Sequence, residues 1–441
     1  MTSPPLPRKH LSGDALIQLL HDEFQKLEDP NPHPDPDTIT LTDALLSGFA
    51  LFSLKDPSLL AFEKRRHDDN LRSIYRIQHV PSDTYLRTLL DDVQPERLRP
   101  SFASVFRCVQ RGKALEPFVF FQGCYLMSLD GTEYFSSNTI HCKACLERQA
   151  KNGTVTYYHQ MLGAALVHPD RREVIPLMPE PIIKQDGQTK NDCERNAAKR
   201  FFEKFRKDHP HLDVIVIEDG LSSNAPHIQE LKRHKMHFIL GAKEGDHKAL
   251  FSKMETEFQD GRAATLTLEE PKEKLLHHFR YLLDVPLNDS NPDLLVNFLE
   301  YWEVSSKGVK YFSWVTDLPL TEQTVYPIMR GGRARWKIEN ETFNTLKNQG
   351  YQFEHNFGHG KQHLSVIFAL LMMLAFFVDQ IQQLCDPLFI AAWQKAGSKR
   401  QLWEDQRALF RTLVLDSLRT LYELIASGFV KQPPVRAEDT S

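Results

Sequence analysis

The chain has 441 residues, of which 41% are hydrophobic and 25% charged, and this is the composition of an ordinary globular protein. The net charge of −4 excludes a uniformly basic protein, so any contact with nucleic acid would rest on local groups of cations. The longest apolar run, Val366 to Val378, is shorter than a membrane span of about 20 residues and has the length of a buried helix. The N-terminus lacks the apolar segment of a secretory signal. We therefore expect a soluble, cytoplasmic protein with no membrane partner, whose six cysteines stay reduced.

The first part of the chain, residues 1–115, has the apolar spacing of helices and predicts a helical N-terminal domain. Basic residues gather between Lys64 and Lys113, and again between Arg330 and Lys337. Both groups would suit contact with a DNA backbone. A solvated surface, or a scaffold of packed helices, explains them about as well, because the sequence carries no helix-turn-helix signature.

The middle of the chain predicts an α/β fold. Apolar, β-branched runs predict strands, and periodic segments predict helices, in the order strand, strand, strand, helix, strand, helix, strand, helix over residues 126–258. This is the order of a ribonuclease-H-like core, a mixed sheet with flanking helices in which the first and fourth strands lie side by side. Alternating segments then predict a mostly antiparallel, β-rich insertion. The expected domains are 1–115, helical; 116–262, first part of the core; 263–330, the insertion; 331–385, the end of the core; and 386–441, helical.

Two of the predicted strands end in an aspartate. The runs Tyr125 to Asp130 and Val214 to Asp219 belong to the first and fourth strands, so Asp130 and Asp219 are expected to lie together. Taken alone, Asp130 before a glycine is ordinary turn chemistry. Glu218 should point to the opposite face from Asp219, and Asp317 and Asp246 are further competing carboxylates.

A third carboxylate lies on a predicted amphipathic helix, Arg333 to Lys347, whose apolar stripe is Trp336, Phe343 and Leu346. Glu339 lies beside this stripe, one turn after Arg335. A carboxylate there is costly unless it binds a cation or pairs with the arginine. Two strand-end aspartates and a helix glutamate together suit Mg²⁺ or Mn²⁺ and phosphoryl transfer.

A second group of candidate ligands is the sequence His141-Cys142-Lys-Ala-Cys145, which has zinc-ligand spacing. Cys193, His159 or His168 could complete four ligands of a structural zinc site. A redox pair and ordinary buried thiols are the alternatives. The segment Glu354 to His363 is rich in imidazole and glycine, and could approach DNA phosphates or form a tight loop.

Taken together, these motifs resemble the DDE transposases of the insertion-sequence-four-like group. The resemblance covers residues 118–380 as an architecture. Its matching segments are Leu129 to Thr132 after the first strand, Ile217 to Gly220 after the fourth, Phe312 to Asp317 in the insertion, and Arg335 to Glu339 on the helix. The resemblance implies that Asp130, Asp219 and Glu339 are catalytic and bind Mg²⁺ or Mn²⁺, as two ions.

The chain also departs from the family signature. Gly332 stands where the family has a tyrosine three positions before Arg335, so no residue here inherits the tyrosine's role. The family lysine follows the glutamate with six residues between, whereas seven separate Glu339 from Lys347 and five separate Glu341 from it. Glu339 is preferred because its spacing from Arg335 fits, and Glu341 stays an alternative. Arg335, Lys347, Arg333 and Lys337 are expected to contact DNA phosphates.

The resemblance implies metal-dependent cleavage of DNA and strand transfer in cut-and-paste transposition. The expected partners are double-stranded DNA, as transposon ends and target, and a second copy of the chain in a homodimer on DNA. The protein would be cytoplasmic and associated with the nucleoid when bound to DNA. The alternatives are a ribonuclease-H-fold nuclease without strand transfer, and a non-catalytic DNA-binding protein derived from a transposase.

Overall fold

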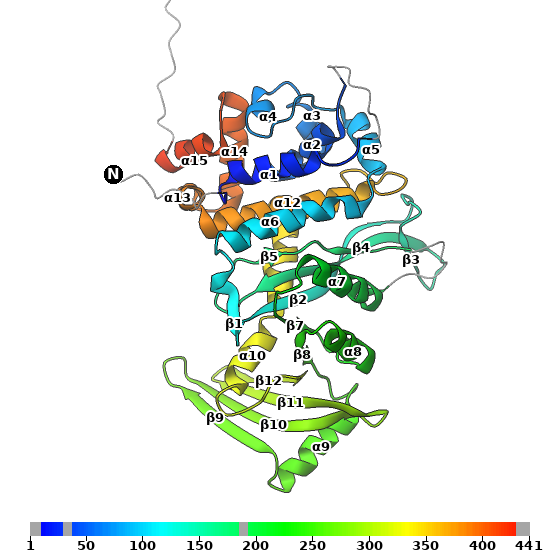
Figure 1. The fold of residues 1–441 in the computed structure, drawn as a ribbon, viewed down its shortest axis with the longest axis vertical. Helices are drawn as coiled ribbons and strands as arrows, with labels where there is room; N and C mark the ends of the chain where they lie inside the picture. Colours follow the sequence, from blue (N-terminus) through cyan, green and yellow to red (C-terminus); the bar gives the residue numbers. More distant parts are fainter. Residues whose placement is uncertain (1–9, 30–37, 185–192, 429–441) are drawn as a thin grey trace, which may run out of the picture.

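The computed structural model describes residues 10–29, 38–184 and 193–428, which form three tiers along the long axis of the molecule (Figure 1). A helical tier lies at one end, a mixed sheet with flanking helices lies in the middle, and long antiparallel hairpins lie at the other end. Both the first and the last helices of the chain belong to the helical tier.

The helical tier is built from segments far apart in the sequence. Most of its helices begin at a serine, threonine or aspartate whose side chain accepts a hydrogen bond from a free N–H of the first turn, as Ser12 and Thr40 do. Asp14 of α1 accepts hydrogen bonds from the N–H groups of Leu418 (2.7 Å) and Arg419 (3.1 Å), which joins α1 to α15. The helices of this tier are α1 (Gly13–Phe24), α2 (Leu41–Ser53), α3 (Leu59–Glu63), α4 (Asp69–Ser73), α5 (Asp83–Asp91), η1 (Pro95–Leu98), α6 (Arg99–Arg111), α12 (Leu364–Cys385), α13 (Pro387–Ala396), α14 (Lys399–Thr412) and α15 (Leu418–Ser427).

The longest helix, α12, runs through the centre of the helical tier and contacts α2, α5 and the strand β5 (Ile175–Pro176). It is long and apolar enough to cross a membrane by composition alone, but 94% of its most apolar window is buried inside the protein. The prediction of a buried helix here is confirmed. Its N-terminus is fixed by Asp91 of α5, whose carboxylate accepts hydrogen bonds from the N–H groups of four consecutive residues, 361 to 364.

The middle tier confirms the ribonuclease-H-like fold. Strand β2 (Cys124–Ser137) pairs antiparallel with β4 (Val155–Val167) and parallel with β7 (Val214–Glu218), and β7 pairs parallel with β8 (His237–Gly241). The short strands β5 and β6 (Glu180–Ile182) together occupy the third-strand position beside β4. Helices α7 (Glu194–Asp208) and α8 (Ala225–Arg233) lie in front of these strands in the view of Figure 1.

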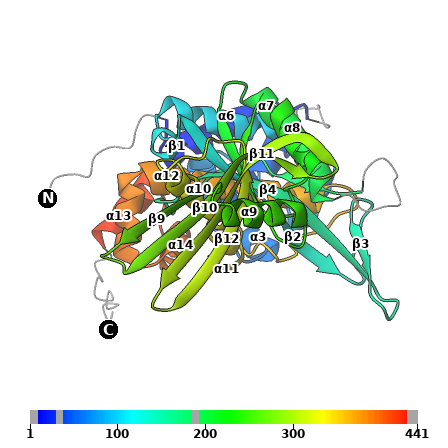
Figure 2. The ribbon, with the colours of Figure 1, turned by 90° about the horizontal axis from the view of Figure 1, so that it is seen from below.

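The insertion is also β-rich, as predicted, but it is not a separate sheet. Strand β12 (Gly308–Thr316) pairs antiparallel with β8, so the hairpins of the insertion extend the core sheet. Figure 2 shows these hairpins from below, with α9 (Lys248–Gln259) lying across them. The other strands of the insertion are β9 (Ala264–Glu270), β10 (Leu275–Asn288) and β11 (Asn291–Ser305).

The predicted end of the first strand at Asp130 is wrong. Strand β2 continues to Ser137, because β4 pairs with it along its whole second half, from Asp130↔Gly163 to Ser137↔Tyr157. The predicted polar excursion also contains a short strand, β3 (Leu146–Gln149), on the far edge of β4. The short segments η2 (Glu116–Phe118) and β1 (Val119–Phe121) precede β2.

The predicted helix over 333–347 is interrupted. Helix α10 (Val325–Arg333) ends at its start, and the chain then forms a π-helix, η3 (Ile338–Phe343), followed by α11 (Asn344–Asn348). Because the π-turn alters the rotation per residue, Phe343 and Leu346 are buried as predicted, whereas Trp336 is 51% exposed. The placement of Trp336 on the apolar stripe is therefore wrong; the Arg335 guanidinium lies over its ring instead, 4.3 Å from the centroid.

We predict that Gly163→Ala destabilises the protein by about 1–3 kcal/mol through overpacking. Gly163 lies on β4 opposite Asp130, and a Cβ added there would come within 2.6 Å of the Phe343 ring on η3. Chemical denaturation would measure the difference. Gly245→Ala, with no atom within 4 Å of the added Cβ, is the matched control and should match the wild type. Equal stability of both variants would contradict the prediction.

Candidate active site

The pairing register of β2 and β7 brings two of the predicted carboxylates to the same level of the sheet. The last parallel pair is Ser128↔Ile217, and two residues farther along each strand are Asp130 and Asp219. Strand β7 ends at Glu218, so Asp219 lies in the turn after the strand, where its Oδ1 accepts a hydrogen bond from the Leu221 N–H (2.9 Å). Asp130 therefore lies where its neighbour strand stops, at the carboxyl end of the parallel pair.

Glu339 reaches the same place from the helical side. The carbonyl of Arg335 accepts a hydrogen bond from Ser128 Oγ (3.0 Å), which fixes the start of the η3 segment over β2. The Arg335 Nη1 then donates to Glu339 Oε1 (2.7 Å) and to Asp130 Oδ2 (3.3 Å). One guanidinium nitrogen thus lies between the two carboxylates and binds both.

The charges of this group are only partly balanced. Burial, followed by the adjacent carboxyl group of Glu339 and its negative charge, raises the pKa of Asp130 to about 7, against the opposing effects of Arg335 and of the Gly131 N–H. The oxygen-rich donor set is one that Mg²⁺ and Mn²⁺ prefer, so the residues present fit a divalent cation.

A cavity of about 310 Å³ opens beside Asp130 and Asp219. It is lined by a further carboxylate that sequence reasoning did not select, Glu194 at the start of α7, whose Oε1 accepts a hydrogen bond from Gln160 Nε2 (2.7 Å). Burial and the charge of Asp219 raise the pKa of Glu194, while the bond from Gln160 lowers it. Glu194 Oε1 packs against Gly131, where an added Cβ would lie 2.0 Å from it and would force the glutamate to move.

The competing carboxylates have other partners. Glu218 also lines the cavity, but its Oε2 lies 2.6 Å from Nε2 of the buried His227. Asp317 accepts hydrogen bonds from the Phe238 N–H and from His237, which joins the insertion to β8. Asp246 is exposed in the loop before α9. Arg335 joins Glu339, and not Glu341, to Asp130, while the charge of Glu341 raises the pKa of Lys337 and Lys399 against the effect of burial.

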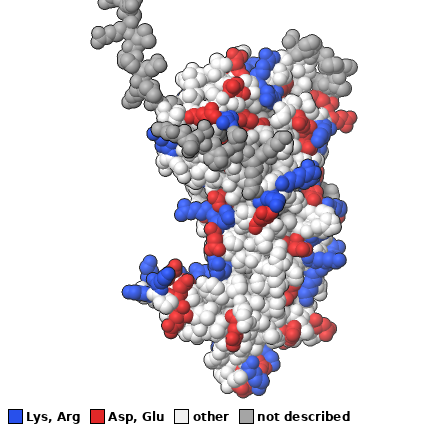
Figure 3. All heavy atoms as spheres, turned by 60° about the vertical axis from the view of Figure 1, so that its left-hand side comes forward, with Lys and Arg blue, Asp and Glu red and all other residues white. Residues whose placement is uncertain are grey.

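The other cations expected to bind phosphate do not join Arg335. Arg333 pairs with Glu303 of β11, and its guanidinium lies over the Phe312 ring. Lys337 donates to the Arg171 carbonyl, and Lys347 pairs with Glu354 (2.7 Å). On the described part of the face in Figure 3, lysines and arginines lie in small groups among aspartates and glutamates. This face carries no continuous basic surface.

The structure gathers part of the predicted zinc motif. Cys142 and Cys145 meet His159 of β4 and His359 of the loop between α11 and α12. His141 is exposed and stacks on the Tyr157 ring, and neither Cys193 nor His168 belongs to the group. His359 lies in the imidazole-rich segment that sequence reasoning assigned either to DNA contact or to a tight loop.

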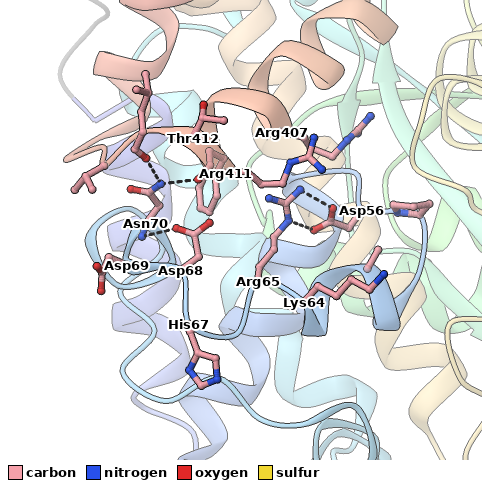
Figure 4. A pocket seen from close by; sticks show the side chains of 15 residues that line it. Asp56, Lys64, Arg65, His67, Asp68, Asp69, Asn70, Arg407, Arg411 and Thr412 are labelled. Atoms are coloured by element: carbon pink, nitrogen blue, oxygen red, sulfur yellow. Dashed lines mark hydrogen bonds and ion pairs between the residues drawn. The ribbon is translucent and has the colours of Figure 1, made fainter. Parts of the chain in front are cut away.

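A larger cavity, of about 840 Å³, lies in the helical tier between α3, α4 and α14 (Figure 4). Some of its polar lining groups hold the surrounding segments together. Arg65 makes two hydrogen bonds to Asp56 (2.9 and 3.0 Å), and the Asn70 amide donates to the carbonyls of Phe410 and Leu413, both at 2.7 Å. Residues from the N-terminal helices and from α14 near the C-terminus therefore meet around this cavity.

Comparison with known proteins adds two findings. A family model described as a transposase DDE domain matches residues 141–377, more than half of the chain. The match contains Asp219 and Glu339 and begins after Asp130. The chain is also similar to the piggyBac transposase in a cryo-EM structure of its synaptic complex with hairpin DNA, with 11% identity, a TM-score of 0.42, and coverage of 100% of this chain and 90% of that chain. No curated protein sequence matches the chain.

We predict that Asp130→Asn stabilises the metal-free protein at pH 8. The folded-state pKa of about 7 lies above the ordinary 3.8, so the wild type loses stability as the pH rises through this range, and an amide removes that loss. The gain should be about 1 kcal/mol at pH 8 and should vanish at pH 4. Thermal melting in a chelator would measure it, with Asp246→Asn as an exposed control. A less stable Asp130→Asn variant at pH 8 would contradict the prediction.

Proposed function

The chain belongs to the family of transposase DDE domains, and we propose that it cuts DNA and joins the cut ends to target DNA with Asp130, Asp219 and Glu339 as its catalytic carboxylates. The observation that supports this assignment is the position of Asp130, level with Asp219 at the end of the adjacent strand and joined to Glu339 through Arg335 Nη1. Membership of the insertion-sequence-four-like group and a cut-and-paste route are parts of the same proposal.

The three carboxylates would hold Mg²⁺ or Mn²⁺, as two ions, with Asp130 shared between them. When bound, divalent cations activate a water or a 3′-hydroxyl and stabilise the leaving oxygen of a phosphodiester. Asp219 approaches the site from the end of β7 and Glu339 from η3. The two carboxylates therefore flank Asp130 from two different elements.

Arg335 has a positioning role in this proposal. Its Nη1 bonds to Glu339 and Asp130 at once, so it holds both side chains in place while the cations are absent. With cations bound at the carboxylates, the Arg335 guanidinium would be available to bind phosphate. Glu194 and Gln160 line the cavity on the other side of Asp130 and would border the entering DNA strand.

The proposed DNA contacts require basic side chains to leave their present protein partners and to bind phosphate instead. Arg333, Lys337 and Lys347 now bind protein groups, and Lys347 and Arg333 are each about one-third exposed, so phosphate could replace their present partners. Double-stranded DNA, a homodimer on DNA, a cytoplasmic location with nucleoid association, and the five-part domain division all stay predictions of this proposal.

We predict that Asp130→Asn, Asp219→Asn and Glu339→Gln each reduce DNA cleavage at least about a hundredfold, because loss of even an outer-sphere partner of a metal site commonly costs 10–100-fold. The assay is Mg²⁺-dependent cleavage of a duplex that carries the inverted repeats flanking the coding sequence. Asp246→Asn is the matched control and should cleave like the wild type. Wild-type activity in Asp219→Asn would overturn the assignment.

The same assay separates the alternatives. Cleaved ends without joined products in a target plasmid would favour a nuclease that lacks strand transfer. DNA binding that is unchanged by Mg²⁺, with no cleavage in the wild type, would favour a non-catalytic DNA-binding protein.

A further inference from the structure

We propose that Cys142, Cys145, His159 and His359 bind one zinc ion in a closed, structural site. The four residues come from three separate segments: the connection between β2 and β3, the strand β4, and the loop between α11 and α12. Their ligand atoms all lie within 4.8 Å of one another. This site is distinct from the carboxylate site in position, in ligand chemistry and in role.

The distances within the group are those of a tetrahedron. A zinc ion with Zn–S bonds of about 2.3 Å and Zn–N bonds of about 2.0–2.1 Å places two sulfurs about 3.8 Å apart, and a sulfur and a nitrogen about 3.5 Å apart. The two Sγ atoms here are 3.8 Å apart. The three sulfur–nitrogen distances are 3.4 Å, 3.5 Å and 3.3 Å, from Cys142 to His159, from Cys145 to His159 and from Cys145 to His359.

The surroundings of the group also suit a bound cation. Cys145, His159 and His359 are buried, and the rings of Tyr134 and Phe135 pack on the two imidazoles. Each imidazole directs Nε2 at a thiol, while its buried Nδ1 has no hydrogen-bond partner. Four polar side chains converge in an apolar shell with little else to bind, and a buried group of this kind is costly unless a cation holds it.

The chemistry of the ligands selects the ion. Two thiolates and two imidazoles in a tetrahedron are typical of zinc, whereas Mg²⁺ and Mn²⁺ prefer oxygen ligands. All four positions are occupied by protein, so the site is closed to water and to substrate, which is the mark of a structural rather than a catalytic zinc. The sulfur separation of 3.8 Å is far longer than a disulfide bond of about 2.05 Å.

The position of the site defines what it would do. His359 is 214 residues from Cys145, so the ion would cross-link two distant parts of the chain. The loop that carries His359 follows η3 and α11, and its far end is held by Asp91 at the start of α12. His359 lies just before Lys361, so zinc would fix this same end of the loop to β4, the direct partner of β2. The ion would therefore tie the segment that leads into α12 to the sheet that carries Asp130.

The test is the zinc content of the purified full-length protein, measured by mass spectrometry of the metal. We expect one zinc per chain in the wild type. Cys142→Ser, Cys145→Ser and His359→Asn should each lower it by about tenfold or more, because a structural site needs its full ligand set. Cys193→Ser and His355→Asn are matched controls on exposed residues, one of them in the same loop, and should keep the full content.

A second measurement does not depend on the folding of the variants. When Co²⁺ replaces zinc in the wild type, two thiolates and two imidazoles in a tetrahedron should give visible absorption and thiolate charge-transfer bands. Removal of the metal should lower the melting temperature and expose two reactive thiols. Wild-type protein without zinc, or with Cys142 and Cys145 in a disulfide, would overturn the proposal. Because neither readout uses DNA, failure of the zinc site and failure of the proposed DNA chemistry are distinguishable.

Discussion

The parallel pairing of β2 with β7 is the constraint on which the site depends. Strand β7 pairs with β2 only over Tyr125 to Ser128, so Asp130 has no β7 residue paired with it on that side. A slip of one residue would turn Asp130 to the other face of the sheet, away from Arg335 and Glu339. The run Val214 to Ile217 is fully buried, so β7 is packed in the core between its neighbours β2 and β8. Packing in the core thus sets the geometry of the carboxylates.

The carboxylates of the candidate site carry negative charges that the surrounding cations balance only in part. Asp130 and Glu339 share one arginine, Glu194 adds a partly buried charge beside Asp219, and burial opposes ionisation of both Asp130 and Glu194. Two buried acids elsewhere have a direct cationic partner: Asp379 binds Lys55 and the Tyr351 hydroxyl, and Asp56 binds Arg65. Incomplete compensation of carboxylate charge beside a cavity is typical of a functional site.

The sequence predicts the fold better than it predicts the site. Local apolar patterns predict the strand β4 at Val155 to Val167 and the buried strand β7. In both strands, most of the apolar residues in the sequence are buried in the fold. The extension of β2 past Asp130 depends on pairing with β4, which local turn chemistry at Gly131 does not reveal. Trp336 is displaced by a π-turn that has no clear pattern in the residues. His359 and Glu194 join their groups through contacts across long stretches of chain, for which a single sequence carries no signal.

The interlocked ends of the chain have a consequence for its biosynthesis. Helices α1 to α6 share their apolar core with α12 to α15, and Asp14 is satisfied only by backbone groups after Ser417. During translation, the first helices therefore emerge from the ribosome long before α12 to α15, which cover them, are synthesised. The nascent chain must keep these apolar faces from aggregating until translation ends. A product terminated before α12 would leave them permanently uncovered.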